Sequence, residues 1–256
     1  MKQLLIATGL CVSILFTGCL DLTQELTISE DGSGELSGKM DMSEVMAMIT
    51  QMGGGSEKDK LAIDSAVLFS SFLDSAKDLS PDEKALLKDA VLNIKINTEE
   101  GKCLLDTKVP FKKISDIDRI NLVMQKYNSV AMDKAISKAT GENPAGTDQA
   151  NGKDNPFGSM PENYFELKCS EGKISRTLKK EKYAKIGEDS TLAKMKEGAE
   201  MGGTINSTFI INLPGPVKKF TGKNVKLSDD KKKITVVNTL DELFDDASKY
   251  EFTIEY

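Results

Sequence analysis

Apolar and polar residues alternate along several short segments of the chain, and turn residues join these segments in pairs. Alternation with a period of two places every second side chain on one face of a β-strand, so each pair predicts a β-hairpin with one apolar face. The pattern predicts hairpins at 22–42, 91–111 and 164–180, a fourth pairing of 207–214 with 232–240, and a last strand at 250–256.

Between the hairpins, apolar residues recur three or four positions apart, which predicts amphipathic helices. The clearest helix start is Ser80 with Pro81 and Glu83, because serine caps a helix, proline suits its first position and glutamate completes a capping box. Further helices are predicted at 43–52, at 56–77, from 115 onward, at 189–203 and at 241–248.

Together these elements predict an α+β fold, in which an antiparallel sheet of successive hairpins is covered by helices on one face. Residues 140–160 are rich in glycine, proline, asparagine and aspartate, so we expect a mobile loop there. We expect one continuous sheet and a single extracytoplasmic domain over 19–256, and two domains separated by the loop are the alternative.

The first 18 residues have the pattern of an export signal. Lys2 precedes an apolar run at 4–16, and Asp21 follows too early for a transmembrane helix of about 20 residues. The stretch Phe16-Thr17-Gly18-Cys19 resembles the lipobox of bacterial lipoproteins, whose preferred form is Leu-Ala-Gly-Cys. An ordinary secretory signal with an incidental cysteine is the alternative.

The lipobox resemblance implies that residues 1–18 are a signal peptide and that Cys19 carries acyl chains such as palmitate, which anchor the mature chain in a membrane. Leu20, in place of aspartate, resembles the sorting pattern for the outer membrane. The implied location is the bacterial cell envelope, at the outer membrane and facing the periplasm or the cell surface.

Two thiols remain once Cys11 is removed with the signal and Cys19 is acylated. They are Cys103 and Cys169, each on a predicted strand beside a similar turn, TEEGKC in one and CSEGK in the other. If the two strands are antiparallel neighbours, both cysteines lie at the same end of the sheet, and an extracytoplasmic compartment permits a disulfide between them. Two buried reduced thiols are the alternative.

The composition excludes several kinds of chemistry. Histidine is absent, which removes zinc sites that use imidazole, the Ser-His-Asp triad and the Cys-His dyad. No phosphate-binding glycine loop or dinucleotide fingerprint is present either. The net charge of −6 and the scattered basic residues argue against nucleic-acid binding. We therefore predict a protein that is not an enzyme, with no cofactor and no metal site.

The helix predicted over 56–77 carries apolar residues along one side, so a groove between it and the sheet would accommodate a hydrophobic ligand. The residues of this candidate groove are Leu61, Leu68, Phe69, Phe72 and Leu73.

One family resemblance follows from two stretches. The lipobox with LTQELTISEDGSGELS, and the later INLPGPVKKFTGKNVKLSDDKKKITV, resemble the LppM-like envelope lipoproteins. The resemblance implies an α+β domain, and lipid binding is proposed for at least one member. This chain departs from that pattern because it ends on the strand YEFTIEY, where LppM-like chains can carry a membrane segment, and because the helices at 56–90 and 115–139 have no counterpart there.

Three functional classes remain. The first is a lipid-anchored, non-enzymatic envelope lipoprotein that binds a partner protein or a hydrophobic ligand. The second is a purely structural or scaffold lipoprotein. The third, with least support, is a carboxylate-dependent hydrolase, because no motif brings its acids together.

Overall fold

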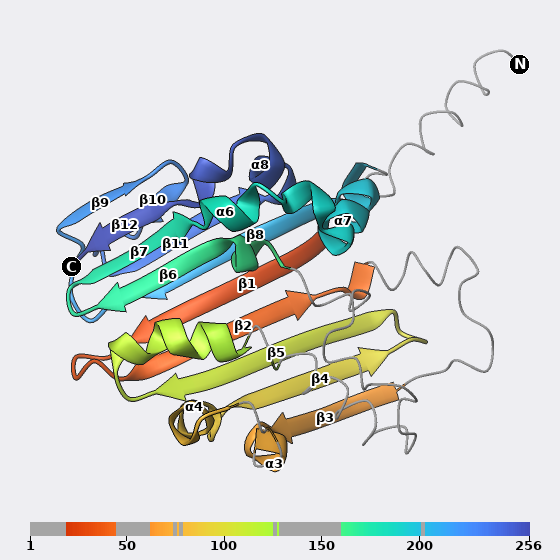
Figure 1. Ribbon diagram of the computed structural model, residues 1–256, viewed down its shortest axis with the longest axis horizontal. Helices are drawn as coiled ribbons and strands as arrows, with labels where there is room; N and C mark the ends of the chain where they lie inside the picture. The colour runs from red at the N-terminus through yellow and green to blue at the C-terminus, as the bar shows by residue number, and fades with distance from the viewer. Residues whose placement is uncertain are drawn as a thin grey trace, which may run out of the picture.

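A computed structural model of the chain describes residues 19–44, 62–73, 76, 79–124, 127, 160–200 and 203–256. The fold consists of two β-sheets with short helices around them (Figure 1). The expected α+β class is confirmed, and the four expected hairpins are pairs of adjacent antiparallel strands.

The larger sheet has eight strands in the order β10-β11-β8-β1-β2-β5-β4-β3. Their bounds are β1 Cys19–Ile28, β2 Gly34–Asp41, β3 Ala62–Leu68, β4 Val91–Asn97, β5 Lys102–Phe111, β8 Thr204–Asn212, β10 Val225–Leu227 and β11 Lys233–Thr239. The smaller sheet has the order β6-β7-β12-β9. Its strands are β6 Phe165–Ser170, β7 Lys173–Leu178, β9 Lys219–Gly222 and β12 Phe252–Glu255. The expectation of one continuous sheet was wrong, because β7 pairs with the late strand β12 instead of joining the first hairpins.

Strand β1 pairs with β2 on one side and with β8 on the other. The β1–β8 pairing is parallel and runs from Cys19 opposite Thr204 to Thr27 opposite Asn212. On the exposed side of the sheet, Asn212 Nδ2 donates hydrogen bonds to Glu25 Oε1 at 2.7 Å and to Thr27 Oγ1 at 3.0 Å. Polar side chains therefore support the only parallel pairing in the described sheets.

The helices are short and connect the strands. They are α3 Ser70–Leu73, α4 Pro81–Leu87, the 3-10 helix η1 Ile114–Asp116 leading into helix 117–124, η2 Pro161–Tyr164, α6 Lys180–Tyr183, η3 Ile186–Glu188, α7 Ser190–Glu200, α8 Leu240–Asp245 and η4 Ala247–Tyr250. The start of α4 has the expected capping box, in which Ser80 and Glu83 satisfy each other's backbone N–H groups.

The smaller sheet covers the β8 side of the inner face of the larger one. Phe209 of β8 stacks on Phe252 of β12 with ring centroids 5.7 Å apart, and both side chains are buried. Helix 117–124 covers the inner face nearer β2 and β5, with Ile117 and Ile120 fully buried in the same core (Figure 1). A second apolar cluster, which includes Leu20, Leu192 and Leu243, packs α7 and α8 against the end where β1 begins.

The helix predicted over 56–77 was wrong in the part that the structure describes. Residues 62–68 form the edge strand β3, which pairs with β4 along its whole length, and only Ser70–Leu73 are helical. Ile63 and Val67 are buried at a spacing that fits period two, and β-branched residues favour a strand. The expected helix 43–52 beyond residue 44, the segment 56–61, and the expected loop 140–160 apart from Met160 lie outside the described residues.

Two glycines of β2 provide a matched test of this packing. A Cβ atom at Gly34 would meet the carbonyl oxygen of Thr27 and lie 2.6 Å from Phe111 Cζ, whereas one at Gly38 would meet nothing within 4 Å. We expect Gly34→Ala to lower the free energy of unfolding by about 1–3 kcal/mol, the usual cost of overpacking. Gly38→Ala should leave it unchanged or raise it by about 0.5–1 kcal/mol, because glycine is costly inside a strand.

Urea unfolding of both variants, monitored by circular dichroism, measures the difference. Equal destabilisation by the two alanines would contradict the packing of β2 described here.

Candidate ligand cavity and buried arginine

A cavity of about 210 Å³ lies between the inner face of the larger sheet, helix 117–124 and the segment that leads into η2. Its floor follows one row across four strands, in which Gly38 pairs with Gln24 on β1 and with Thr107 on β5, and Thr107 pairs with Leu92 on β4. Gly38 lies in line with Leu36 and Met40 by strand alternation, so its missing side chain leaves space where its neighbours project.

The lining of this cavity is largely apolar. Leu22, Leu36 and Leu105 project from the sheet, and Met124 from helix 117–124 and Met160 close the opposite side. Methionine is flexible and polarizable, and it adapts to ligands of irregular shape. The arrangement is therefore suited to an apolar group with few polar contacts.

A second cavity, of about 90 Å³, adjoins the first. Gln24, Asn121 and Glu162 line both cavities, so these three side chains form the boundary between them. The lining of the second cavity also includes Arg176 and Lys179, together with the carboxylate of Glu166.

Arg176 is a buried charge between the two sheets. Its side chain is 4% exposed, and its guanidinium carbon lies 4.6 Å from the ring centroid of Phe165, 5.3 Å from that of Tyr250 and 5.9 Å from that of Phe209. These distances correspond to cation–π contacts, which attract the cation electrostatically but provide no anionic partner. Burial lowers the pKa of Arg176 and the carboxylate of Glu162 opposes this, but arginine remains protonated in proteins.

Glu162 is the acidic group nearest to Arg176. Its Oε1 lies 4.0 Å from Arg176 Nη2, beyond hydrogen-bond distance, and accepts a hydrogen bond of 2.7 Å from Ser207 Oγ. Within the described part of the chain, Nη2 of Arg176 has no hydrogen-bond partner although it is buried. The arginine therefore retains a donor facing a protein interior in which unpaired polar groups are costly.

The two candidate disulfide cysteines are free thiols. Cys103 lies on β5 of the larger sheet and Cys169 on β6 of the smaller one, so the premise that their strands are antiparallel neighbours was wrong. Both side chains are buried, and burial is the main reason that the pKa of each thiol is raised. Such thiols are poor nucleophiles.

The candidate groove residues that the structure describes, Leu68, Phe69 and Leu73, do not line either cavity. Phe69 and Leu73 are fully packed in the main core, whereas Leu68 is 54% exposed at the sheet edge. Leu61 and the side chain of Phe72 lie outside the described residues. Cys19 begins β1, and its backbone pairs with Thr204.

Sequence reasoning missed Gly38, Glu162 and Arg176. The sequence held a signal for two of them: a glycine at an inward position of an alternating strand for Gly38, and for Arg176 an arginine at an inward position of β7 in a chain whose only other arginine is Arg119.

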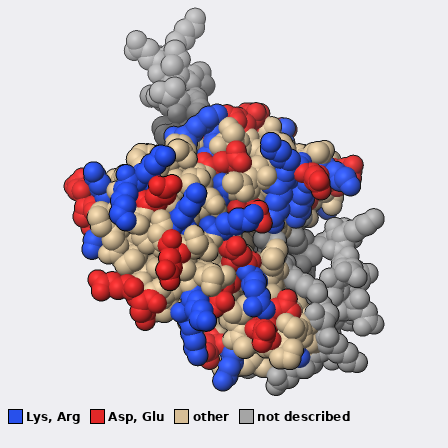
Figure 2. All heavy atoms as spheres, turned by 60° about the vertical axis from the view of Figure 1, so that its left-hand side comes forward, with Lys and Arg blue, Asp and Glu red and all other residues tan. Residues whose placement is uncertain are grey.

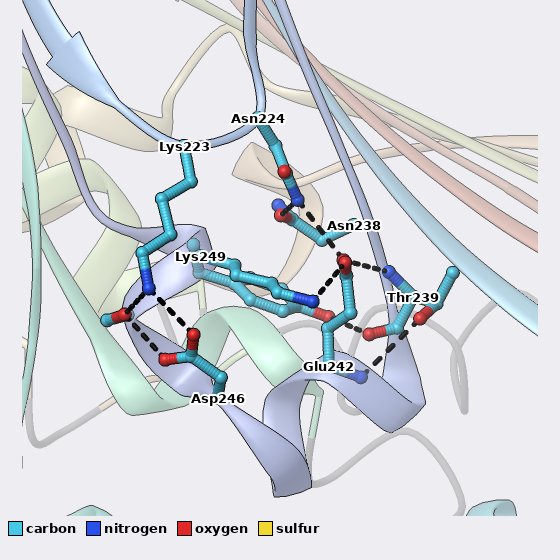
Figure 3. A network of polar contacts seen from close by, with 9 residues as sticks. Lys223, Asn224, Asn238, Thr239, Glu242, Asp246 and Lys249 are labelled. Carbon is cyan, nitrogen blue, oxygen red and sulfur yellow. Dashed lines mark hydrogen bonds and ion pairs between the residues drawn. The ribbon is translucent and has the colours of Figure 1, made fainter.

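A second polar cluster lies at the end of β11 (Figure 3). Glu242 of α8 forms a capping box with Thr239 and accepts a hydrogen bond of 2.9 Å from Lys249, while Lys223 Nζ donates to Asp246 Oδ2 at 2.7 Å. The cluster joins the loop at 223–224 to α8 and η4. Its acids are therefore occupied in capping and ion pairing, which indicates a structural role.

Charges on the rest of the surface are mixed. Over the face drawn in Figure 2, lysines are interspersed with aspartates and glutamates. In the described ranges, no set of three acidic or cysteine side chains is arranged to hold a metal ion, and no helix has the length and apolarity that crossing a bilayer requires.

A scan against protein-family models and a search of curated proteins both find no match to this chain. Among solved structures, the chain is similar to the folded domain of LppM from Mycobacterium tuberculosis, determined by NMR. The two share 11% sequence identity and a TM-score of 0.33, over 95% of this chain and 94% of that one. LppM-like similarity is thus present in weak form, and at this score we derive no functional property from it.

The ion pair of the β11 cluster allows a pH test. Hydrogen bonds from Lys223 and Ser248 lower the pKa of Asp246 from 3.8 to about 2. Because the folded pKa is lower than the unfolded one, the stabilisation by this carboxylate is complete above pH 3.8 and is lost as the pH falls towards 2. We expect Lys223→Met to move the Asp246 pKa, measured by carboxyl NMR titration, back towards 3.8.

Lys226→Met, at an exposed position of β10, is the control and should leave the titration of Asp246 unchanged. An Asp246 pKa that is the same with and without the Lys223 amino group would refute the ion pair.

Proposed function

We propose that the protein is a lipid-anchored, non-enzymatic lipoprotein of the bacterial cell envelope, and that its domain binds a hydrophobic ligand. Ligand binding is supported by the cavity of about 210 Å³, which has Gly38 on its floor and a largely apolar lining. Interiors are close-packed with few voids larger than a water molecule, so an apolar space of this volume beside a strand glycine supports a binding site.

The anchoring part of the proposal is supported by the position of Cys19. The lipobox cysteine is also the first residue of β1 and is already paired with β8, so no tether separates the acylation point from the folded domain. An acylated Cys19 would hold the β1 end of the larger sheet, together with α7, directly at the membrane surface (Figure 1). Two or more acyl chains make such anchoring stable.

The non-enzymatic part is supported by the side chains that are present. The sequence has no histidine, and the described thiols, Cys103 and Cys169, are buried with raised pKa values. The strongest acidic cluster in the described part, around Glu242 and Asp246, is used for capping and ion pairs.

Filling the cavity tests ligand binding. We expect native mass spectrometry of the full-length protein, released from a non-ionic detergent, to show a bound apolar molecule of defined mass. Gly38→Leu places a branched side chain in the cavity, so the additional mass of the bound molecule should disappear. Gly38→Ala leaves most of the space open, so the additional mass should remain.

Thermal unfolding should show that Gly38→Leu is folded and at least as stable as the wild type, because a Cβ atom at this position meets nothing within 4 Å. Retention of the ligand mass in the Gly38→Leu protein would place the ligand elsewhere and refute the cavity as its site.

Metabolic labelling tests the anchor. Cells given an alkyne-tagged fatty acid should label the wild-type protein and Cys103→Ser, but not Cys19→Ser, because only the Cys19 thiol lies in the lipobox. The intact mass should also show the loss of residues 1–18. If the wild-type protein is not labelled, the proposed anchor is refuted, and the ordinary secretory signal becomes the interpretation of the first 18 residues.

A further inference from the structure

We propose that Arg176 forms an anion subsite at the inner end of the cavity, and that the ligand is a single-chain amphiphile with a carboxylate head group. This inference rests on the proposed hydrophobic ligand and adds the chemistry of its polar end. The chain would lie over Gly38 in the larger cavity, and the carboxylate would reach past Gln24 and Asn121 into the smaller one.

The first support is the unpaired donor of Arg176. Its Nη2 atom is buried and has no hydrogen-bond partner among the described residues, although the side chain lines the smaller cavity. A buried cation without a hydrogen-bonded anion is costly to the fold, and such groups are retained where they act on a ligand. A carboxylate bound there would remove this cost.

The second support is that the neighbours of Arg176 hold it in place without accepting a hydrogen bond from its Nη2 atom. Phe165, Phe209 and Tyr250 interact with the guanidinium through their rings. Glu162 lies 4.0 Å away and is hydrogen-bonded to Ser207. The arginine is therefore positioned by packing and by the ion pair with Glu162, while its Nη2 donor is left for one oxygen of a carboxylate.

The lining of the smaller cavity favours a monoanion. Glu162 and Glu166 both line it, and although Glu166 pairs with Lys168 at 3.0 Å, a dianionic phosphate would meet more repulsion there than a carboxylate would. The two cavities, of about 210 and about 90 Å³, together reach only the lower end of the usual range for ligand pockets, which starts at roughly 300 Å³. This small size favours one acyl chain over two.

The test compares two ligands that differ only in the head group. Equilibrium dialysis of radiolabelled decanoate and 1-decanol is carried out at neutral pH against the full-length protein in nanodiscs, with empty nanodiscs as the blank. We expect decanoate to bind at least about tenfold more tightly than decanol, as for one hydrogen bond to a charged group. Arg176→Met should lower the decanoate-to-decanol affinity ratio to about one. Arg119→Met, at an exposed position of helix 117–124, should leave the ratio unchanged.

A second variant keeps the arginine and so does not depend on how Arg176→Met folds. Glu162→Gln removes the nearest competing carboxylate, so it should increase the decanoate-to-decanol ratio. An unchanged ratio would mean that Glu162 and the ligand carboxylate do not compete for interaction with Arg176, which would overturn the subsite.

The remaining outcomes separate the two proposals. If both ligands bind equally and Gly38→Leu blocks both, the cavity function stands and the carboxylate subsite is overturned. If Gly38→Leu blocks neither, the cavity function fails as well. Tighter binding of decyl phosphate than of decanoate would assign the head group to phosphate, and binding of acetate as tight as that of decanoate would show that the chain contributes nothing; either result overturns the inference.

Discussion

The parallel pairing of β1 with β8 is the contact on which the larger sheet depends. It joins residues 185 positions apart, and without it the sheet would separate into the β1-β2-β5-β4-β3 part and the β8-β11-β10 part. The same strand also connects the two features argued to matter for function. It begins at Cys19 and, five residues later, Gln24 stands between the two cavities. A long-range pairing of this kind is entropically costly to form, because the loop between its partners must close first.

The local parts of this fold could be predicted from the sequence, and the long-range parts could not. Alternation and turn residues specify three of the four hairpins within about twenty residues each, and the capping box at Ser80 is contained in four. Contacts between distant segments decide two features that local pattern does not: the pairing of β1 with β8, and the place of β6 and β7 in a second sheet. The prediction of a helix over 56–77 failed where two periods competed, since Leu68, Phe69 and Leu73 suit a helix while Ile63 and Val67 suit an edge strand.

The candidate site was less predictable than the fold for a related reason. A cavity is made by what three elements leave unfilled, and a glycine such as Gly38 signals only that one side chain is missing. Arg176 carried a stronger signal, as one of two arginines in a lysine-rich chain and at an inward position of its strand. The environment of Arg176 depends on Phe209 from the other sheet and on Tyr250, which lies more than seventy residues further along the chain. Neither neighbour follows from local sequence pattern.

The geometry of β1 also links the anchor to the cavity. An extended strand rises about 3.3 Å per residue, so five residues place the boundary between the cavities roughly 17 Å from Cys19, the proposed acylation point. That distance is about half the thickness of the hydrocarbon core of a bilayer. If Cys19 is acylated as proposed, a domain held this closely, with no tether between Cys19 and β1, would keep its cavity near the surface from which an amphiphile would come. The apolar chain alone gains little by leaving the bilayer, because one hydrocarbon environment replaces another. Any selectivity must then come from the head group, and the smaller cavity offers the unpaired Nη2 donor of Arg176, with Lys179 also in its lining, to supply it.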